Sequence, residues 1–170
     1  HYAQCLMNGG EYNGVQLLSP ESVAALFDGI ISAPYGEGED PKYALGWSVE
    51  SPTEEMPYTV IQHSGGMGTS SSFLIMVPEL KLAVVTAENS STGLIPVVAR
   101  AAIAFAMEQD PEVVVEDLRL AKLVDKIKGM YQSAYGMYTM KIMVKAGVLQ
   151  ADIEVDDGSV SLPLFPENLN

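Results

Sequence analysis

The chain has 170 residues, 48% of them hydrophobic, which is enough for one ordinary domain or for one core with a smaller addition. Its 9 Lys and Arg against 22 Asp and Glu give a net charge of -13, which argues against nucleic acid or an anionic membrane as a partner. One cysteine and two histidines are too few for an internal disulfide or the usual zinc cluster, and no apolar stretch is long enough to span a bilayer. We therefore expect no metal, no cofactor and no membrane span.

The first 27 residues carry signals for a helix end, a turn and a helix start. Gly9–Gly10 predicts the end of a first helix, and Asn13–Gly14 predicts a turn before a short extended segment. Ser19 as the N-cap and Pro20 at the first helical position then predict a second helix, which extends to about Phe27.

The middle of the chain reads as an antiparallel meander followed by an apolar helix. The segments "ALGWSVE", "YTVIQH", "SSSFLIMV" and "KLAVVTAEN" are extended in character and are separated by turn residues. Because Phe73–Val77 and Leu82–Val85 are nearly continuous apolar runs, both faces of these two strands are expected to be covered. The segment Gly93–Met107 is polar only at Arg100 and fits a helix packed on the sheet. The fold class is therefore α+β, with an antiparallel sheet and helices layered on it.

The C-terminal third changes in character. Residues Glu116 to Lys128 have helical apolar spacing, with acids first and lysines last, as the helix dipole favours. The remainder alternates between apolar and polar residues around turns at Ala146–Gly147 and Asp157–Gly158, which predicts short strands. We expect a first domain over residues 1–110, a connecting helix over 111–129 and a partial β-rich domain over 130–170.

The most informative motif is His63-Ser64-Gly65-Gly66 at the end of a predicted strand. Neighbouring side chains of a strand point to opposite faces, so His63 and Ser64 cannot act together as base and nucleophile. The two glycines lack Cβ atoms, which lets a ligand approach the backbone and lets an N–H group face a developing oxyanion. The alternative is a loose hairpin turn with His63 as a solvated residue.

Several separated segments resemble one enzyme superfamily. The segments "LLSPESVAALF", "YALGWSVE" and "HSGGMGTSSSFLIMVPELKLAVVTAENS" look like the C-terminal part of the serine β-lactamase-like hydrolases. This superfamily includes class C β-lactamases, penicillin-binding proteins, esterases and D-amino-acid peptidases. The resemblance covers about Tyr2 to Met107 and implies the C-terminal part of a β-lactamase-like fold.

The resemblance implies roles for four residues. His63, Ser64 and Gly65 match the third catalytic motif of the superfamily, which is often His-x-Gly in its peptidase and esterase branches. By this resemblance His63 is a catalytic residue that binds or polarises the substrate, and the Gly66 N–H is an oxyanion-hole donor. Ser64 and Gly65 line the substrate. Glu21 and Trp47 match the framework without a catalytic role.

The sequence departs from the superfamily in lacking its first two motifs. No serine is followed three residues later by lysine, and neither Tyr-x-Asn nor Ser-x-Asn occurs in the 170 residues. In the superfamily these motifs precede the His-x-Gly strand and activate the nucleophile. The expectation is a C-terminal piece of a longer hydrolase that forms an acyl-serine intermediate. Such a piece would be inactive alone, with the N-terminal part of the same protein as its partner and a small molecule or peptide as substrate.

The tail resembles the start of the lipocalin-like β domain that follows the catalytic domain in some peptidase and esterase members. Apolar sheet surface left without its helical layer would favour a homo-oligomer. Two other functions remain open. One is a non-enzymatic binding or regulatory module on the same scaffold. The other is a self-contained hydrolase with Ser64, Ser70 or Ser71 as nucleophile.

Overall fold

The computed structural model of the protein describes residues 1–32, 41–90, 92–145, 148–155 and 158–165. The chain divides into two compact units, His1–Val115 and Glu116–Asn170, which are described separately. The turn expected at Ala146–Gly147 lies outside the described residues, as does Asp157 of the other expected turn.

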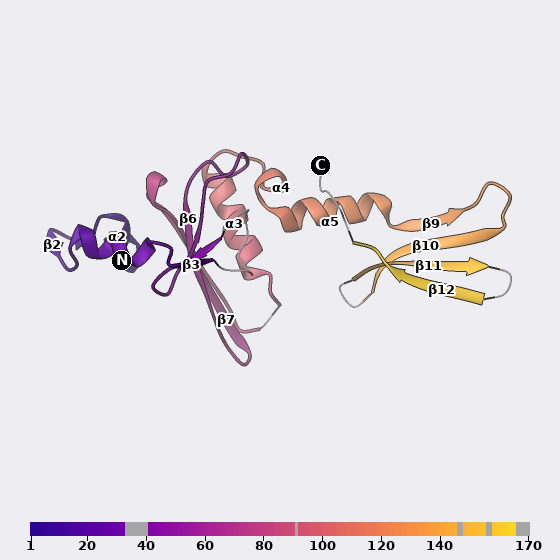
Figure 1. The fold of residues 1–170 in the computed structure, drawn as a ribbon, viewed down its shortest axis with the longest axis horizontal. Helices are drawn as coiled ribbons and strands as arrows, with labels where there is room; N and C mark the ends of the chain where they lie inside the picture. Colours follow the sequence, from indigo (N-terminus) through magenta and orange to yellow (C-terminus); the bar gives the residue numbers. More distant parts are fainter. Residues whose placement is uncertain (33–40, 91, 146–147, 156–157, 166–170) are drawn as a thin grey trace. The chain divides into compact units, whose positions relative to one another are not determined.

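The first unit is built on a six-stranded antiparallel sheet with the order β3-β4-β5-β6-β7-β8. Figure 1 labels β3, β6 and β7 of this sheet, with helix α3 beside them. The meander expected from the sequence is therefore confirmed, and it is extended at one end by two short strands. A separate two-stranded hairpin, β1 and β2, precedes the sheet. The strands are β1 (Glu11–Tyr12), β2 (Val15–Gln16), β3 (Ile31–Ser32), β4 (Lys42–Tyr43), β5 (Ser48–Glu50), β6 (Val60–Met67), β7 (Ser70–Val77) and β8 (Leu82–Glu88).

The helices of this unit begin and end where the local signals predict. The Ser19 side chain accepts a hydrogen bond from Ser22 N at 3.2 Å, which caps the helix that starts at Pro20. Asn13 and Gly14 have φ of 52° and 77°, the left-handed values that a tight hairpin turn requires. The helices are α1 (Tyr2–Met7), α2 (Pro20–Phe27), the short 3-10 helix η1 (Pro78–Leu80), α3 (Ile95–Ala106) and α4 (Pro111–Val114).

Helices cover the sheet on both faces. On one face α3 packs against β7 and β8, and its Ala99 and Ile103 join Val60, Phe73 and Ile75 in a buried cluster. On the other face α1 and α2 contribute to a second cluster, whose buried members are Leu6, Val23, Trp47, Ile61 and Met76. Trp47 is 6% exposed and packs against Tyr2 and Phe27, which agrees with a framework role.

The expectation that both faces of the last strand are covered is wrong. Along β8 the residues alternate between half-buried and exposed, and Val85 is 70% exposed. Its neighbour β7 buries Phe73 and Ile75 on one face and Met76 on the other. The reason is position, because β8 ends the sheet and helix α3 covers only one of its faces.

The second unit consists of one helix and a four-stranded antiparallel meander with the order β12-β11-β10-β9. Helix α5 carries Glu116 and Asp117 in its first turn and Lys126 in its last, as its dipole favours. The elements are α5 (Glu116–Ile127), β9 (Gly129–Gln132), β10 (Tyr138–Lys145), β11 (Val148–Val155) and β12 (Gly158–Pro163).

The two units together make the protein a mixed α+β structure with antiparallel sheets, as the sequence predicts. Across the described part of the chain, no helix combines the length and apolar character that a bilayer crossing requires.

Candidate active site

The predicted site residues, His63 to Gly66, lie in the middle and later part of β6, which ends at a two-residue turn of Gly68 and Thr69. The strand register pairs His63 with Leu74, which packs on the cluster beneath α1 and α2. It pairs Ser64 with Phe73, which belongs to the cluster beneath α3. His63 and Ser64 therefore lie on opposite faces of the sheet.

Among the described residues, the stretch of β6 from His63 to Met67 has a paired strand on one side only. Strand β5 pairs with Val60 to Gln62 and ends there, so within the described residues no strand flanks His63 to Met67 on the side away from β7. Because the turn has two residues, Met67 and Ser70 close it as a hydrogen-bonded pair. Alternation along the antiparallel ladder then directs the N–H of Gly66 away from β7, toward the open side.

The two glycines of the motif differ in how much room they leave. A Cβ on Gly65 would lie 3.0 Å from Ser72 Oγ, whereas a Cβ on Gly66 would come no closer than 3.9 Å to any neighbour, the Ser70 carbonyl oxygen. Gly65 therefore allows the close pairing of β6 with β7. Gly66 is exposed and leaves space beside its amide.

The imidazole of His63 has a partner that sequence reasoning missed. Tyr43 Oη lies 3.0 Å from His63 Nε2, and the two ring centroids are 6.1 Å apart. Tyr43 belongs to β4, and β5 lies between β4 and β6 in the sheet. The two residues are 20 positions apart, and only the sheet order brings them together. No local signal in the sequence indicates this pair.

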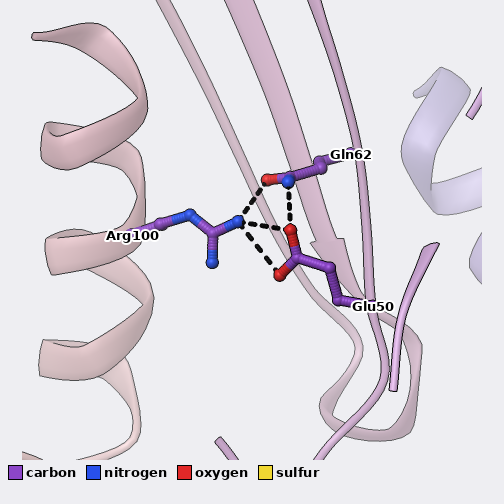
Figure 2. Close-up of polar contacts among 3 residues, drawn as sticks. All are labelled: Glu50, Gln62 and Arg100. Carbon is purple, nitrogen blue, oxygen red and sulfur yellow. Dashed lines mark hydrogen bonds and ion pairs between the residues drawn. The ribbon is translucent and has the colours of Figure 1, made fainter. Parts of the chain in front are cut away.

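A buried ionic network lies directly behind the site. Figure 2 shows Arg100 of α3 reaching toward Glu50 of β5 and Gln62 of β6. Arg100 Nη2 lies 2.8 Å and 3.0 Å from the two carboxylate oxygens of Glu50, and 2.8 Å from Gln62 Oε1. Gln62 Nε2 donates a hydrogen bond to Glu50. All three residues are buried, so the network fixes the end of β5 and the residue that precedes His63.

A second polar cluster surrounds Glu88 at the end of β8. The Ser90 hydroxyl donates to Glu88 Oε2 at 2.8 Å, and Thr92 donates from both its backbone N–H and its hydroxyl. Ser71 Oγ lies 2.8 Å from Glu88 Oε1 and donates to it. The hydrogen bonds from Ser90, Thr92 and Ser71, in that order, hold the pKa of Glu88 below its ordinary value of 4.5. The Ser71 hydroxyl thus forms a hydrogen bond with the carboxylate of Glu88 at the end of β8, and it is not bonded to His63.

The depressed pKa of Glu88 predicts a specific acid response. A carboxyl group whose pKa is lower in the folded state contributes stability above its unfolded pKa, and this contribution is lost as pH falls through the folded pKa. We expect Glu88→Gln to be less destabilised than the wild type by acidification from about pH 6 to about pH 3. Urea midpoints across this range, followed by Trp47 fluorescence, measure the difference. A Glu88→Gln curve that runs parallel to the wild-type curve would refute the prediction.

The second unit contains a cavity unrelated to these residues. It measures about 430 Å³ and lies between α5 and the strands β9 and β10. Its lining residues are Val124, Asp125, Lys128, Gly129, Met130, Lys141, Ile142, Met143 and Val144.

Comparison with known proteins places the fold. No protein-family model and no curated protein matches the sequence. Among solved structures, the chain is similar to the octameric penicillin-binding protein homologue from Pyrococcus abyssi, with a TM-score of 0.83 and 23% sequence identity. The match covers 99% of this chain and 36% of that chain, so the present chain spans about a third of the homologue. The protein therefore has the fold of that part of a penicillin-binding protein homologue.

Proposed function

We propose that this chain forms one wall of an acyl-transfer site in a serine hydrolase. The observation that carries the proposal is the stretch of β6 from His63 to Met67, where an exposed imidazole and an exposed glycine amide lie three residues apart on one strand. Among the described residues, no strand pairs with this stretch on the side away from β7. In this role His63 binds or polarises the substrate, and the Gly66 N–H stabilises the oxyanion of the tetrahedral intermediate. Ser64 and Gly65 line the bound substrate.

The chemistry proposed is the hydrolysis of a peptide, ester or β-lactam through an acyl-serine intermediate. A nucleophile of the Ser-x-x-Lys type is absent from the 170 residues, so we propose that preceding polypeptide of the same protein supplies it. The absence of this motif equally favours the second candidate, a binding or regulatory module. The coding sequence upstream of His1 distinguishes the two, because the hydrolase requires Ser-x-x-Lys in frame and the module does not.

A self-contained hydrolase has less support from the contacts. Among the described residues no hydrogen bond joins His63 to a serine, and the Ser71 hydroxyl bonds to Glu88. A fluorophosphonate that reacts with activated serines is expected to leave the 170-residue chain unlabelled. A stoichiometric adduct on Ser64, Ser70 or Ser71, located by mass spectrometry, would overturn the shared-site proposal.

The role of the Gly66 amide can be tested by a substitution that removes its N–H group. In the protein encoded by the complete gene, Gly66→Pro is expected to lower kcat for a chromogenic ester by about 10²- to 10³-fold, the usual effect of losing one oxyanion donor. Gly66→Ala is the matched control, since it keeps the N–H and its Cβ meets nothing closer than 3.9 Å. Unchanged Trp47 fluorescence shows that both variants are folded. Equal activity of the two variants would refute the role of this amide.

Two further features belong to the proposal. We propose that the second unit, with its four-stranded meander, is the start of a lipocalin-like β domain that shapes the substrate channel or the assembly. A homo-oligomer is also proposed, since the structurally similar homologue is octameric. Light scattering of the purified protein measures this directly.

A further inference from the structure

We propose that Tyr43 is a positioning residue that fixes the tautomer of His63, so that His63 meets its substrate as an N–H donor through Nδ1. The inference rests on the proposed function in one respect, namely that the Nδ1–H group binds a substrate. The effect of Tyr43 on the tautomer of His63 can be measured without a substrate. Its basis is the 3.0 Å contact between Tyr43 Oη and His63 Nε2.

The polarity of this hydrogen bond follows from the two groups. A neutral imidazole has one N–H donor and one acceptor nitrogen, and the bond made by one nitrogen decides which of them carries the proton. The phenolic O–H is the stronger donor of the two groups, and an imidazole lone pair is a better acceptor than a phenolic oxygen. Tyr43 therefore donates to Nε2, and the ring proton resides on Nδ1.

This tautomer determines what the site can recognise. Among the residues that the structure describes, none forms a hydrogen bond with His63 Nδ1, and the side chain is exposed. An Nδ1–H group binds an acceptor oxygen, such as the carbonyl or carboxylate of a substrate. The opposite tautomer would leave Nδ1 as a base able to take a proton from a nucleophile. Tyr43 thus selects substrate binding over proton abstraction as the role of His63.

The chain carries an internal control for this inference. It has only two histidines, and the other one, His1, also contacts a tyrosine. Tyr12 Oη bonds to Nδ1 of His1, whereas Tyr43 bonds to Nε2 of His63. Nδ1 of His1 also lies 3.4 Å from Gln4 Oε1, which can only accept a hydrogen bond, so the argument assigns a tautomer to His63 alone. His1 serves as the control for removing a neighbouring phenol.

The test is long-range ¹H–¹⁵N correlation spectroscopy of the ¹⁵N-labelled 170-residue chain, at alkaline pH where imidazole rings are neutral. Wild-type His63 is expected mainly as the Nδ1–H tautomer. Tyr43→Phe is expected to shift the tautomer ratio toward Nε2–H by about fivefold, the factor that corresponds to a hydrogen bond of about 1 kcal/mol. Tyr12→Phe, the matched control, should change the ¹⁵N shifts of His1 and leave those of His63 unchanged.

Two results would overturn the inference. One is a His63 ring that is mainly Nε2–H in the wild type, which would mean that Tyr43 accepts rather than donates. The other is a tautomer ratio that Tyr43→Phe leaves unchanged. Because the measurement needs no substrate or nucleophile, either result removes the role of Tyr43 and leaves the proposed function standing. Loss of the proposed function would instead appear as absent hydrolysis by the protein from the complete gene, with the tautomers unaffected.

Discussion

Replacing Arg100 by methionine is expected to lower the free energy of unfolding of the first unit by about 3–5 kcal/mol. The guanidinium is 7% exposed and bonds to both oxygens of Glu50, which is 6% exposed. Removing it takes away the cation that bonds to both oxygens of a buried carboxylate, and breaking a buried ion pair from one side is strongly unfavourable. Urea denaturation followed by the fluorescence of Trp47, the only tryptophan, reports on this unit.

Two controls separate the buried charge from other effects of the Arg100 substitution. Lys81→Met removes a surface ammonium that bonds to the Met7 carbonyl and Asn8, and it is expected to change stability by no more than about 1 kcal/mol. The triple variant Glu50→Leu, Gln62→Met, Arg100→Met removes the whole network and should recover most of the loss. A triple variant as unstable as Arg100→Met alone would show that lost packing, and not the buried carboxylate, causes the effect.

Truncation of Ile75 to alanine is expected to destabilise the first unit by about 2–5 kcal/mol. Ile75 lies on β7 in the cluster between the sheet and α3, and it is 0% exposed. The substitution removes three buried carbons, and the cavity left behind cannot close because a strand and a helix form its walls.

The matched control for Ile75 is Val85→Ala on the neighbouring strand β8. Val85 is 70% exposed, so its truncation should change stability by less than about 0.5 kcal/mol. Thermal or urea unfolding of the two variants, with Trp47 fluorescence as the signal, gives the comparison. A loss at Val85 as large as that at Ile75 would mean that the outer face of β8 is covered in solution by another molecule.

Local sequence signals predicted the elements that depend on local physics. The Ser19–Pro20 start of α2 and the Asn13–Gly14 turn were both predicted, because capping and left-handed backbone conformations are properties of a few consecutive residues. The α+β class was likewise predicted, since the alternation of extended and helical segments limits how layers can form. The resemblance to β-lactamase-like hydrolases anticipated the fold that the structural comparison supports.

The sequence could not predict features that depend on distant partners. Arg100 stands out as the polar residue of an apolar helix, yet its partner Glu50 lies 50 positions away and no periodicity connects them. Tyr43 is similarly joined to His63 only by the order of strands. The wrong expectation that both faces of β8 are covered has the same origin. An apolar strand has the same sequence pattern whether it lies in the middle of a sheet or at its end. The roles of His63, Ser64, Gly65 and Gly66 in catalysis remain predictions.

The cysteine on the short helix α1 can report on local opening of the fold. Its Cys5, the only cysteine, is buried, and the adjacent Leu6 packs in the cluster that also holds Trp47. A thiol reagent reaches Cys5 when α1 detaches, and the same event changes the surroundings of Trp47, because Tyr2 of α1 stacks on its ring. The rate of thiol modification under native conditions therefore measures how often the helical layer on the His63 face of the sheet opens, without any engineered label.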